Sequence, residues 1–186
     1  YTNKRKANKL GHETLTDGLL KDGLTDVYNH SHMGNAAELC AEKYHISREQ
    51  QDEYALQSYA KATNATTQGK FKEEVIPFKL RIKQNEVVIN DDEDIYKIIP
   101  EKVSKLKPSF VEDGTITAAN ASNLNDGAAA LLLASAEAVE KYNLKPLAKI
   151  IGYADAALAP EWFTIAPSVA IPKALRRANL ELETID

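Results

Sequence analysis

The chain has 186 residues, of which 44% are hydrophobic and 27% charged, a balance typical of soluble globular proteins. Its net charge of −4 does not indicate bulk nucleic-acid binding, and no apolar run is long enough to predict a membrane span. The single cysteine, Cys40, excludes an internal disulfide and indicates a reducing compartment.

The N-terminal third is predicted to hold a loop and two helices. Residues 1–20 are basic and rich in turn signals, which predicts a solvated loop or, as the alternative, a loop that contacts anions or another subunit. Apolar residues at helical spacing predict a helix over residues 33–44. A second helix should begin after Ser47, because Ser47 and Gln50 match a capping box, and it should end at Gly69.

Two short strands are expected next, over residues 74–80 and 86–90. Pro77 lies inside the first of them and predicts an edge position or a bulge, because proline has no N–H to donate to a neighbouring strand. The acidic run that follows, over residues 91–94, is expected to be a solvated turn.

The last third alternates between strand and helix signals. The apolar run over residues 127–134 predicts a strand buried on both faces, and Ser135 is a suitable N-cap for the helix that follows. A further strand is expected over residues 147–158 and a further helix over 166–178. This order predicts an α/β layered body, into which residues 1–123 are inserted as a mixed, polar segment.

Composition and spacing give few candidates for chemistry. His30 and His32 would lie on one side of an extended stretch, as a metal-binding pair does, but no third ligand has a recognisable spacing. Cys40 lies among apolar residues of a predicted helix, which favours a structural thiol over a nucleophile. The residues alone therefore predict only an α/β piece with a polar insertion.

Three long stretches resemble the thiolase family. They are DGLTDVYNHSHMGNAAELCAEKYHISREQQDEYALQSY, KLKPSFVEDGTITAANASNLNDGAAALLL and FTIAPSVAIPKAL. Together they follow the family's order across essentially the whole chain. The HMG triplet at His32–Gly34 is similar to that of the short-chain, biosynthetic branch, the acetyl-CoA acetyltransferases.

The resemblance implies a reversible Claisen condensation of two acetyl-CoA molecules to acetoacetyl-CoA and CoA, through an acetyl-cysteine intermediate. In the family, the nucleophilic Cys, a His and a second Cys lie in motifs that flank the region seen here, and Cys40 matches none of them. The chain is therefore expected to be inactive alone. The alternatives are a degradative 3-ketoacyl-CoA thiolase and a non-catalytic thiolase-like protein that binds acyl-CoA.

The resemblance also implies three regions. Residues 1–123 correspond to the loop domain, a mixed α+β lid that binds CoA and is inserted in the thiolase-like α/β body. Residues 124–145 correspond to the last strand and helix of the N-terminal catalytic half, and residues 146–186 to the start of the C-terminal half. The abrupt ends of the sequence predict a piece cut from a longer protein.

A CoA-binding surface is implied along the lid. Its expected members are Leu24, His32, Met33, Lys97, Lys102, Phe110, Ala118 and Ser122. The two lysines match the nucleotide end of the pocket, and Lys97 stands where an Arg is often found. Ser122 matches a serine that hydrogen-bonds a pantetheine amide, and Phe163 matches a position beside the acyl pocket. For Met33 and Phe110, core packing is the alternative.

A potassium ion is a further implication of the resemblance. Its expected ligands are Tyr59 and the backbone carbonyls of Ala118, Ala119 and Ala121, and carbonyl oxygens suit a hard cation of this kind. The alternative for Tyr59 is simple packing on a helix face.

The remaining expectations concern the assembly and its location. The basic stretch from Lys4 to Lys9 matches a protruding hairpin of tetrameric members, which implies a homotetramer built as a dimer of dimers. The partners expected are acetyl-CoA and acetoacetyl-CoA, with no nucleic acid and no membrane. An intracellular location is expected, cytoplasmic first, with mitochondria and peroxisomes as alternatives.

Overall fold

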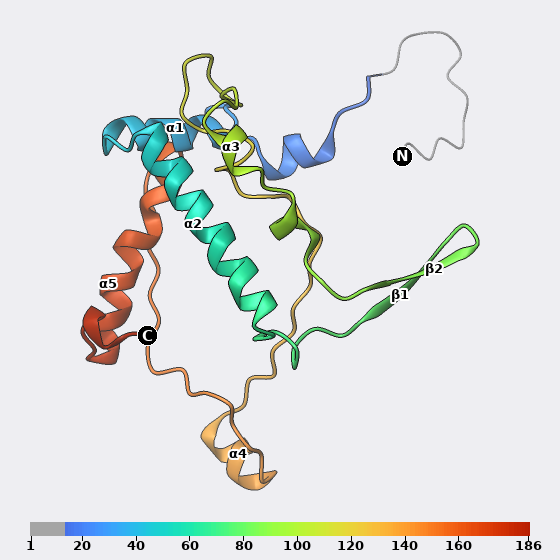
Figure 1. The fold of residues 1–186 in the computed structure, drawn as a ribbon. Coiled ribbons are helices and arrows are strands. Elements are labelled where there is room, and N and C mark those ends of the chain that lie inside the picture. Colours follow the sequence, from blue (N-terminus) through green and yellow to red (C-terminus); the bar gives the residue numbers. More distant parts are fainter. Residues whose placement is uncertain (1–13) are drawn as a thin grey trace, which may run out of the picture.

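The computed structural model describes residues 14–186, and two helices frame its N-terminal half (Figure 1). Helix α1 covers Met33–Lys43 and helix α2 covers Arg48–Thr67. The predicted capping box is confirmed, since Ser47 Oγ accepts from the Gln50 N–H and the Gln50 side chain accepts from the Ser47 N–H. Gly69 follows the end of α2 with φ +70°, a left-handed conformation that favours glycine.

Short helical segments surround these two helices. The π-helix η1 covers Leu19–Gly23 and precedes α1, whereas the 3₁₀-helix η2 (Glu93–Tyr96) and the one-turn helix α3 (Pro100–Val103) lie further along the chain. The predicted basic loop falls largely outside the described residues, including its Lys4 to Lys9 stretch. No helix in the described part of the chain is both long and apolar enough to cross a membrane.

The two predicted strands form an antiparallel hairpin that projects away from the helices (Figure 1). Strand β1 covers Phe78–Ile82 and strand β2 covers Asn85–Ile89, with Phe78 opposite Ile89 and Ile82 opposite Asn85. Strand β1 begins directly after Pro77, the residue that cannot donate to a neighbouring strand. Both strands are therefore confirmed, the first with its bounds shifted toward the C-terminus and the second within one residue of its predicted bounds.

Two of the C-terminal helices agree with the prediction. Helix α4 covers Ala136–Lys141 and is capped by Ser135, whose Oγ accepts from the Ala138 N–H at 3.1 Å. Helix α5 covers Ala166–Ala178, preceded by the 3₁₀-helix η3 (Pro160–Ile165) and followed by η4 (Leu182–Thr184).

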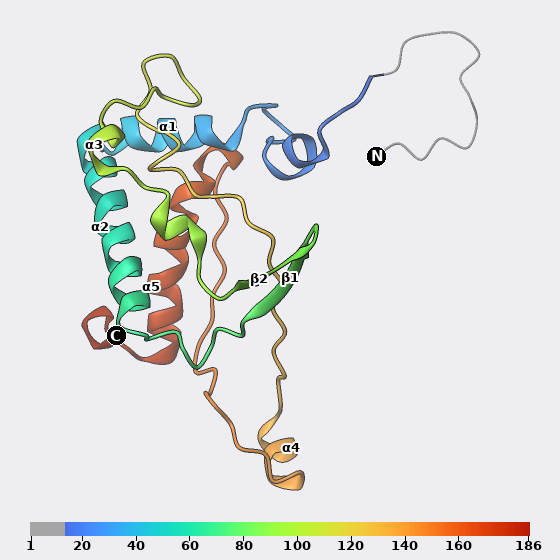
Figure 2. The same cartoon turned by 45° about the vertical axis from the view of Figure 1, so that its right-hand side comes forward.

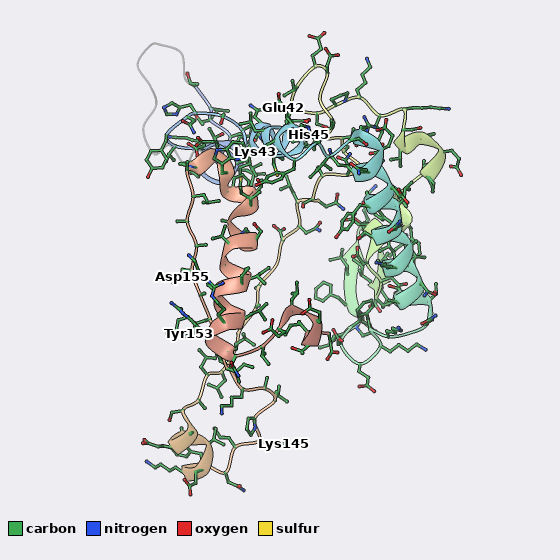
Figure 3. The ribbon with its side chains drawn as sticks, turned by 90° about the vertical axis from the view of Figure 1, so that its left-hand side faces the viewer. Glu42, Lys43, His45, Lys145, Tyr153 and Asp155 are labelled. Carbon is green, nitrogen blue, oxygen red and sulfur yellow. The ribbon has the colours of Figure 1, made fainter. Side chains whose placement is uncertain are left out.

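The segment that precedes η3 lies along α5 (Figure 3). Arg177 donates to the carbonyl of Tyr153 at 2.7 Å and Lys173 donates to the carbonyl of Asp155 at 3.3 Å. Helix η3 in turn packs on α1, where Lys43 Nζ lies 4.0 Å from the centroid of the Trp162 ring. These contacts join the C-terminal part of the chain to its N-terminal helices.

The strands predicted over residues 127–134 and 147–158 are wrong for this structure. Both segments are extended without a strand partner, and in two views they follow separate paths to and from α4 (Figures 1 and 2). Leu131 and Leu132 are 91% and 90% exposed. A strand forms only when a neighbour pairs its N–H and C=O groups, and among residues 14–186 the only sheet is the β1–β2 hairpin. Residues 14–186 thus form mixed helices with one small sheet.

The core is small and lies where α1, α2, α3 and the loop of residues 115–121 meet. Its buried apolar side chains are Ala36, Ala41, Ala55, Ile95, Val103, Ile116 and Ala119. Two polar residues are buried with them, Asp52 and Thr117. Most of the core side chains are small, so the loop backbone can approach the helices closely.

Candidate functional site

Two cavities collect most of the site residues expected from the sequence. The first, which we call the Tyr59 cavity, has a volume of about 320 Å³ and lies between α2, α3 and the loop of residues 115–121. Five expected site residues line it: Tyr59, Lys97, Lys102, Ala118 and Ala119. Helix α2 supplies the tyrosine, the segment of η2 and α3 supplies the lysines, and the loop supplies the alanines.

The second cavity, which we call the His32 cavity, has a volume of about 350 Å³ and lies at the N-terminus of α1. His32 and Met33 line it together with Phe163, which comes from η3. These residues are more than a hundred positions apart in the sequence, and the packing of η3 on α1 brings them together. The cavity thus joins the expected pantetheine residues to the expected acyl-pocket residue.

The orientation of His32 is determined by the cap of α1. Its Nδ1 accepts a hydrogen bond from the Gly34 N–H at 2.9 Å, so in the neutral imidazole the proton is on Nε2. Its ring also stacks on Phe110, with centroids 4.8 Å apart and an interplanar angle of 27°. His32 is therefore the N-cap of α1, and its Nε2 is the ring nitrogen left to donate a hydrogen bond.

Phe110 reaches His32 by lying directly over Gly34. A Cβ atom added at Gly34 would collide with the Phe110 ring, so the close approach needs glycine at this position. Phe110 lines neither cavity and acts here through its contact with the His32 ring. The structure thus explains the first and last residues of the HMG triplet. His32 caps α1 through its imidazole, and Gly34 leaves room for the Phe110 ring.

Lys97 and Lys102 differ in their surroundings. Lys97 Nζ lies 2.8 Å from Glu93 Oε1 and 2.7 Å from Asp94 Oδ1. The hydrogen bonds to these two carboxylates raise the pKa of Lys97 above its ordinary value, and the Lys97 ammonium lowers the pKa of Asp94. In the part of the chain that the structure describes, no carboxylate pairs with Lys102. Lys102 is thus the lysine whose charge is open to an anion.

Several backbone carbonyls in the loop of residues 115–121 accept no hydrogen bond within the described part of the chain. Thr117 N–H is bonded to Asn120 Oδ1 at 2.7 Å, and the N–H of Ala121 is bonded to the Thr117 carbonyl at 2.9 Å, which closes a tight turn. Within residues 14–186, no donor is bonded to the carbonyl oxygens of Ala118, Ala119 or Ala121. A turn of this kind presents oxygen atoms that are free to accept from a ligand or to coordinate a cation.

Besides Phe110, three expected residues lie outside both cavities. Leu24 precedes α1, and its carbonyl accepts from the Met33 N–H at 2.9 Å. Ala121 and Ser122 follow the tight turn, and Ser122 is exposed. Among residues 14–186, no group of three or more His, Cys, Asp or Glu side chains is placed to hold a metal ion, so His30 and His32 gain no third ligand there. Cys40 lies half-buried in α1.

The sequence analysis missed a group of polar residues around the buried Asp52. Arg48 and Asp52 form an ion pair at 2.7 Å on α2, and Asn120 is bonded to Asp52 from the loop. The Arg-to-Asp spacing of four residues on a helix was a signal for the ion pair. The sequence held no signal for the contact with Asn120, which lies 68 positions further on.

Comparisons with known proteins identify the family of the chain. The model of the family "Thiolase, N-terminal domain" matches residues 1–137, and the chain belongs to the thiolase family. The mitochondrial acetyl-CoA acetyltransferase of Mus musculus is 50% identical over 187 residues, which cover 100% of this chain and 44% of that protein. A cytosolic acetyl-CoA acetyltransferase of Gibberella zeae is 45% identical over 186 residues, 99% of this chain and 47% of that protein.

A comparison with solved structures also finds a thiolase. The crystal structure of the Acat5 thiolase from Ascaris suum in complex with coenzyme A matches with a TM-score of 0.85 and 44% identity, over 98% of this chain and 47% of that one. The chain is thus homologous to acetyl-CoA acetyltransferases over its whole length, and it spans about half the length of these relatives.

Proposed function

We propose that this chain is the central part of an acetyl-CoA C-acetyltransferase and contributes its CoA-binding lid. Residues 1–123 would form the lid, residues 124–145 the end of the N-terminal catalytic half, and residues 146–186 the start of the C-terminal half. The observation that carries the proposal is the His32 cavity, in which Phe163 meets His32 and Met33. It is strengthened by the similar Ascaris suum thiolase, which was solved with coenzyme A.

The residues of this chain would bind and orient the CoA arm rather than carry out the condensation. The pantetheine arm has two amides, which need hydrogen-bond partners once water is excluded. His32 Nε2, the Ser122 hydroxyl and the open carbonyl of Ala118 are the partners we assign. Lys102 would contact the phosphates at the nucleotide end, and Phe163 would lie beside the acyl group.

A potassium ion fits the Tyr59 cavity. Tyr59, Ala118 and Ala119 line the same space, and the carbonyls of Ala118, Ala119 and Ala121 have no donor among residues 14–186. A hard monovalent cation is satisfied by such oxygens, together with a phenol. The ion would hold the turn of residues 117–121 in the shape that the CoA arm contacts.

The activity is tested on the full-length protein. Incubation with acetyl-CoA should form acetoacetyl-CoA and release one free thiol for each condensation, measured with a thiol reagent and by absorbance. A full-length protein that cleaves only long-chain 3-ketoacyl-CoA would be a degradative thiolase, and one that binds acyl-CoA without turnover would be a non-catalytic relative. Either result would contradict the proposal.

The potassium ligand set is tested with Tyr59→Phe, which removes only the hydroxyl. The activity of the parent protein should rise with potassium more than with sodium at equal ionic strength. In the variant, the potassium preference should be lost, because the phenol oxygen is one of the ligands. An unchanged preference would exclude Tyr59 from the ion's coordination.

The assembly and the location are parts of the same proposal. We expect a homotetramer, which a measurement of the mass in solution would test. The relatives include both a mitochondrial and a cytosolic enzyme. Within an intracellular setting, we propose the cytoplasm, with mitochondria and peroxisomes as the other outcomes of a fractionation experiment.

A further inference from the structure

Asp52 is the only carboxylate among the buried residues that the structure describes, and its position needs an explanation. It is 7% exposed, and burying a carboxylate costs several kcal/mol unless it is paired and hydrogen-bonded. Both of its oxygens have partners: Oδ2 accepts from Arg48 Nε at 2.7 Å, and Oδ1 accepts from Asn120 Nδ2 at 2.9 Å. Asp52 thus joins an arginine of its own helix to an asparagine of the loop.

Arg48 ties one wall of the Tyr59 cavity to α2. Its Nη2 donates to the carbonyl of Val103 at 2.9 Å and to the carbonyl of Leu106 at 3.1 Å. Val103 and Leu106 both line the cavity. The guanidinium therefore holds the end of α3 and the residues after it in a fixed place beside the first turn of α2.

Asn120 ties the opposite wall to the same helix. Besides its bond to Asp52, its Nδ2 donates to the Thr115 carbonyl at 3.1 Å, and its Oδ1 accepts from the Thr117 N–H at 2.7 Å. Ala118 and Ala119, the two loop residues that line the cavity, lie between Thr117 and Asn120. The position of their carbonyls therefore depends on the Asn120 side chain.

A second tether holds the base of the loop from another helix. Glu38 of α1 accepts from the N–H groups of Thr115 and Ile116 at 2.9 Å and from the Thr115 hydroxyl at 2.8 Å. The next residue, Thr117, is 0% exposed. Gln51 of α2 also donates to the Thr115 hydroxyl at 2.8 Å, so the start of the loop is held by two helices. The Asn120–Asp52 contact holds the other end of the turn against α2.

Tyr59 is carried by the same helix as this anchor. It lies seven residues after Asp52, which is two helical turns and therefore the same face of α2. We propose that Arg48, Asp52 and Asn120 are positioning residues: they hold both walls of the Tyr59 cavity on the helix that carries Tyr59, and so fix the separation between its phenol and the loop carbonyls. The inference rests on the function proposed above, and it assigns to that site three residues that would touch neither CoA nor the ion.

Disrupting the contacts among Arg48, Asp52 and Asn120 should affect cation binding more than any other property of the site. Carbonyl ligands must be held in place before the ion arrives, and loss of the groups that orient metal ligands typically costs about 10- to 100-fold in metal affinity. Loosening the network should therefore raise the half-saturating potassium concentration by about that factor and raise the KM for CoA less. The kcat at saturating potassium should change little, because no reacting group is removed.

The test uses the full-length protein with Asn120→Asp, which places a second carboxylate against Asp52. The double variant Asp52→Asn with Asn120→Asp restores an amide–carboxylate pair and should recover much of the potassium response. Gln57→Glu is the matched control, since Gln57 on the exposed face of α2 donates to Glu53 at 3.2 Å, and the change also opposes two carboxylates. The control should leave the potassium response unchanged.

Two readouts separate positioning from general stability. The first is the half-saturating potassium concentration for activity, measured well below the unfolding temperature of each variant. The second is the rise in unfolding temperature on adding potassium instead of sodium, which reports binding without catalysis. If Asn120→Asp does not fold, Arg48→Lys gives the same test, because lysine keeps the charge but loses the planar fork that reaches two carbonyls.

The results distinguish this inference from the proposed function. A parent protein that responds to potassium, with variants as sensitive as the parent, would overturn the inference and leave the function standing. The inference would also be overturned if Gln57→Glu weakened the potassium response as much as Asn120→Asp does. A parent without condensation activity and without a potassium effect would contradict the proposed function before any substitution is made, and the inference would fail with it.

Discussion

Lys97 and Lys102 line the same cavity but carry their charges in different surroundings. The ammonium of Lys97 is shared by Glu93 and Asp94, whereas among residues 14–186 Lys102 has no carboxylate partner. The pKa of Lys97 is raised and that of Asp94 is lowered, so the pair stays charged across neutral pH. The stabilisation due to Asp94 is lost only as the pH falls through its lowered pKa, and that due to Lys97 only as the pH rises through its raised pKa.

Lys102→Ala should therefore weaken CoA binding more than Lys97→Ala does. An exposed charge contact contributes up to about 1 kcal/mol, so the dissociation constant should rise about two- to fivefold for Lys102→Ala. The loss should shrink as salt is added, because salt screens the attraction between lysine and phosphate. Calorimetric titration of CoA at two salt concentrations measures both effects. Equal losses for the two lysines, or no salt dependence, would remove Lys102 from the nucleotide contact.

Gly34→Ala should displace Phe110 from His32. The new Cβ collides with the phenyl ring, and overpacking of this kind costs about 1–3 kcal/mol, more than the gain of up to about 1 kcal/mol from replacing glycine in a helix. Both the unfolding temperature and the affinity for CoA should fall. Gly18→Ala is the control, since a Cβ at Gly18 meets no atom within 4 Å and its φ is −66°. Similar effects of the two changes would mean that the Phe110 contact is not responsible.

At the scale of elements, α2 organises the site. It begins at the Ser47 capping box, carries Arg48 and Asp52 in its first turns, and presents Tyr59 to the cavity two turns later. The same helix borders the core through Ala55. A change at the start of α2 should therefore reach the site, although Ser47 itself lines neither the Tyr59 nor the His32 cavity.

Ser47→Ala should fray the first turn of α2. Loss of an N-cap side chain typically costs about 1 kcal/mol, and amide hydrogen exchange over residues 48–52 should become faster. Ser135→Ala removes the same kind of cap from α4, a six-residue helix that borders neither cavity, so it should not change CoA affinity. Loss of CoA affinity in Ser135→Ala, or unchanged exchange in Ser47→Ala, would contradict this view of α2.

At the scale of the whole molecule, the C-terminal third packs loosely against the rest of the described chain. The extended segments of residues 127–134 and 147–158 run out to α4 and back (Figure 2). Large apolar side chains of both segments are exposed. Leu147 is 100% exposed. An exposed apolar strand without partners is a site for association with other chains.

The 186-residue chain by itself should therefore aggregate, and it should be inactive toward acetyl-CoA. Replacing Leu131 and Leu132 by Glu should raise its solubility without lowering its unfolding temperature, because both side chains are about 90% exposed and contribute little to packing. Light scattering and thermal unfolding measure the two effects. A large fall in unfolding temperature would mean that these leucines are buried in the chain alone.

The sequence predicted what depends on near neighbours. The start of α2 at Ser47, its end before Gly69 and the cap of α4 at Ser135 all follow from contacts within four residues. Strands β1 and β2 were predicted from their local composition, whereas their pairing as a hairpin came from the structure. The strand over residues 127–134 failed because apolar composition does not supply a partner strand.

Family membership was also readable from the sequence alone, because long motifs such as HMG and TAANAS carry it. Only the tertiary structure decided that His32, Met33 and Phe163 share one cavity. It also decided that Arg48 and Asn120 pair with the buried Asp52 and so hold the loop on α2. The physical reason is distance along the chain. Caps and turns are determined by local hydrogen bonds, whereas a buried carboxylate is tolerated only where packing brings a distant amide to it.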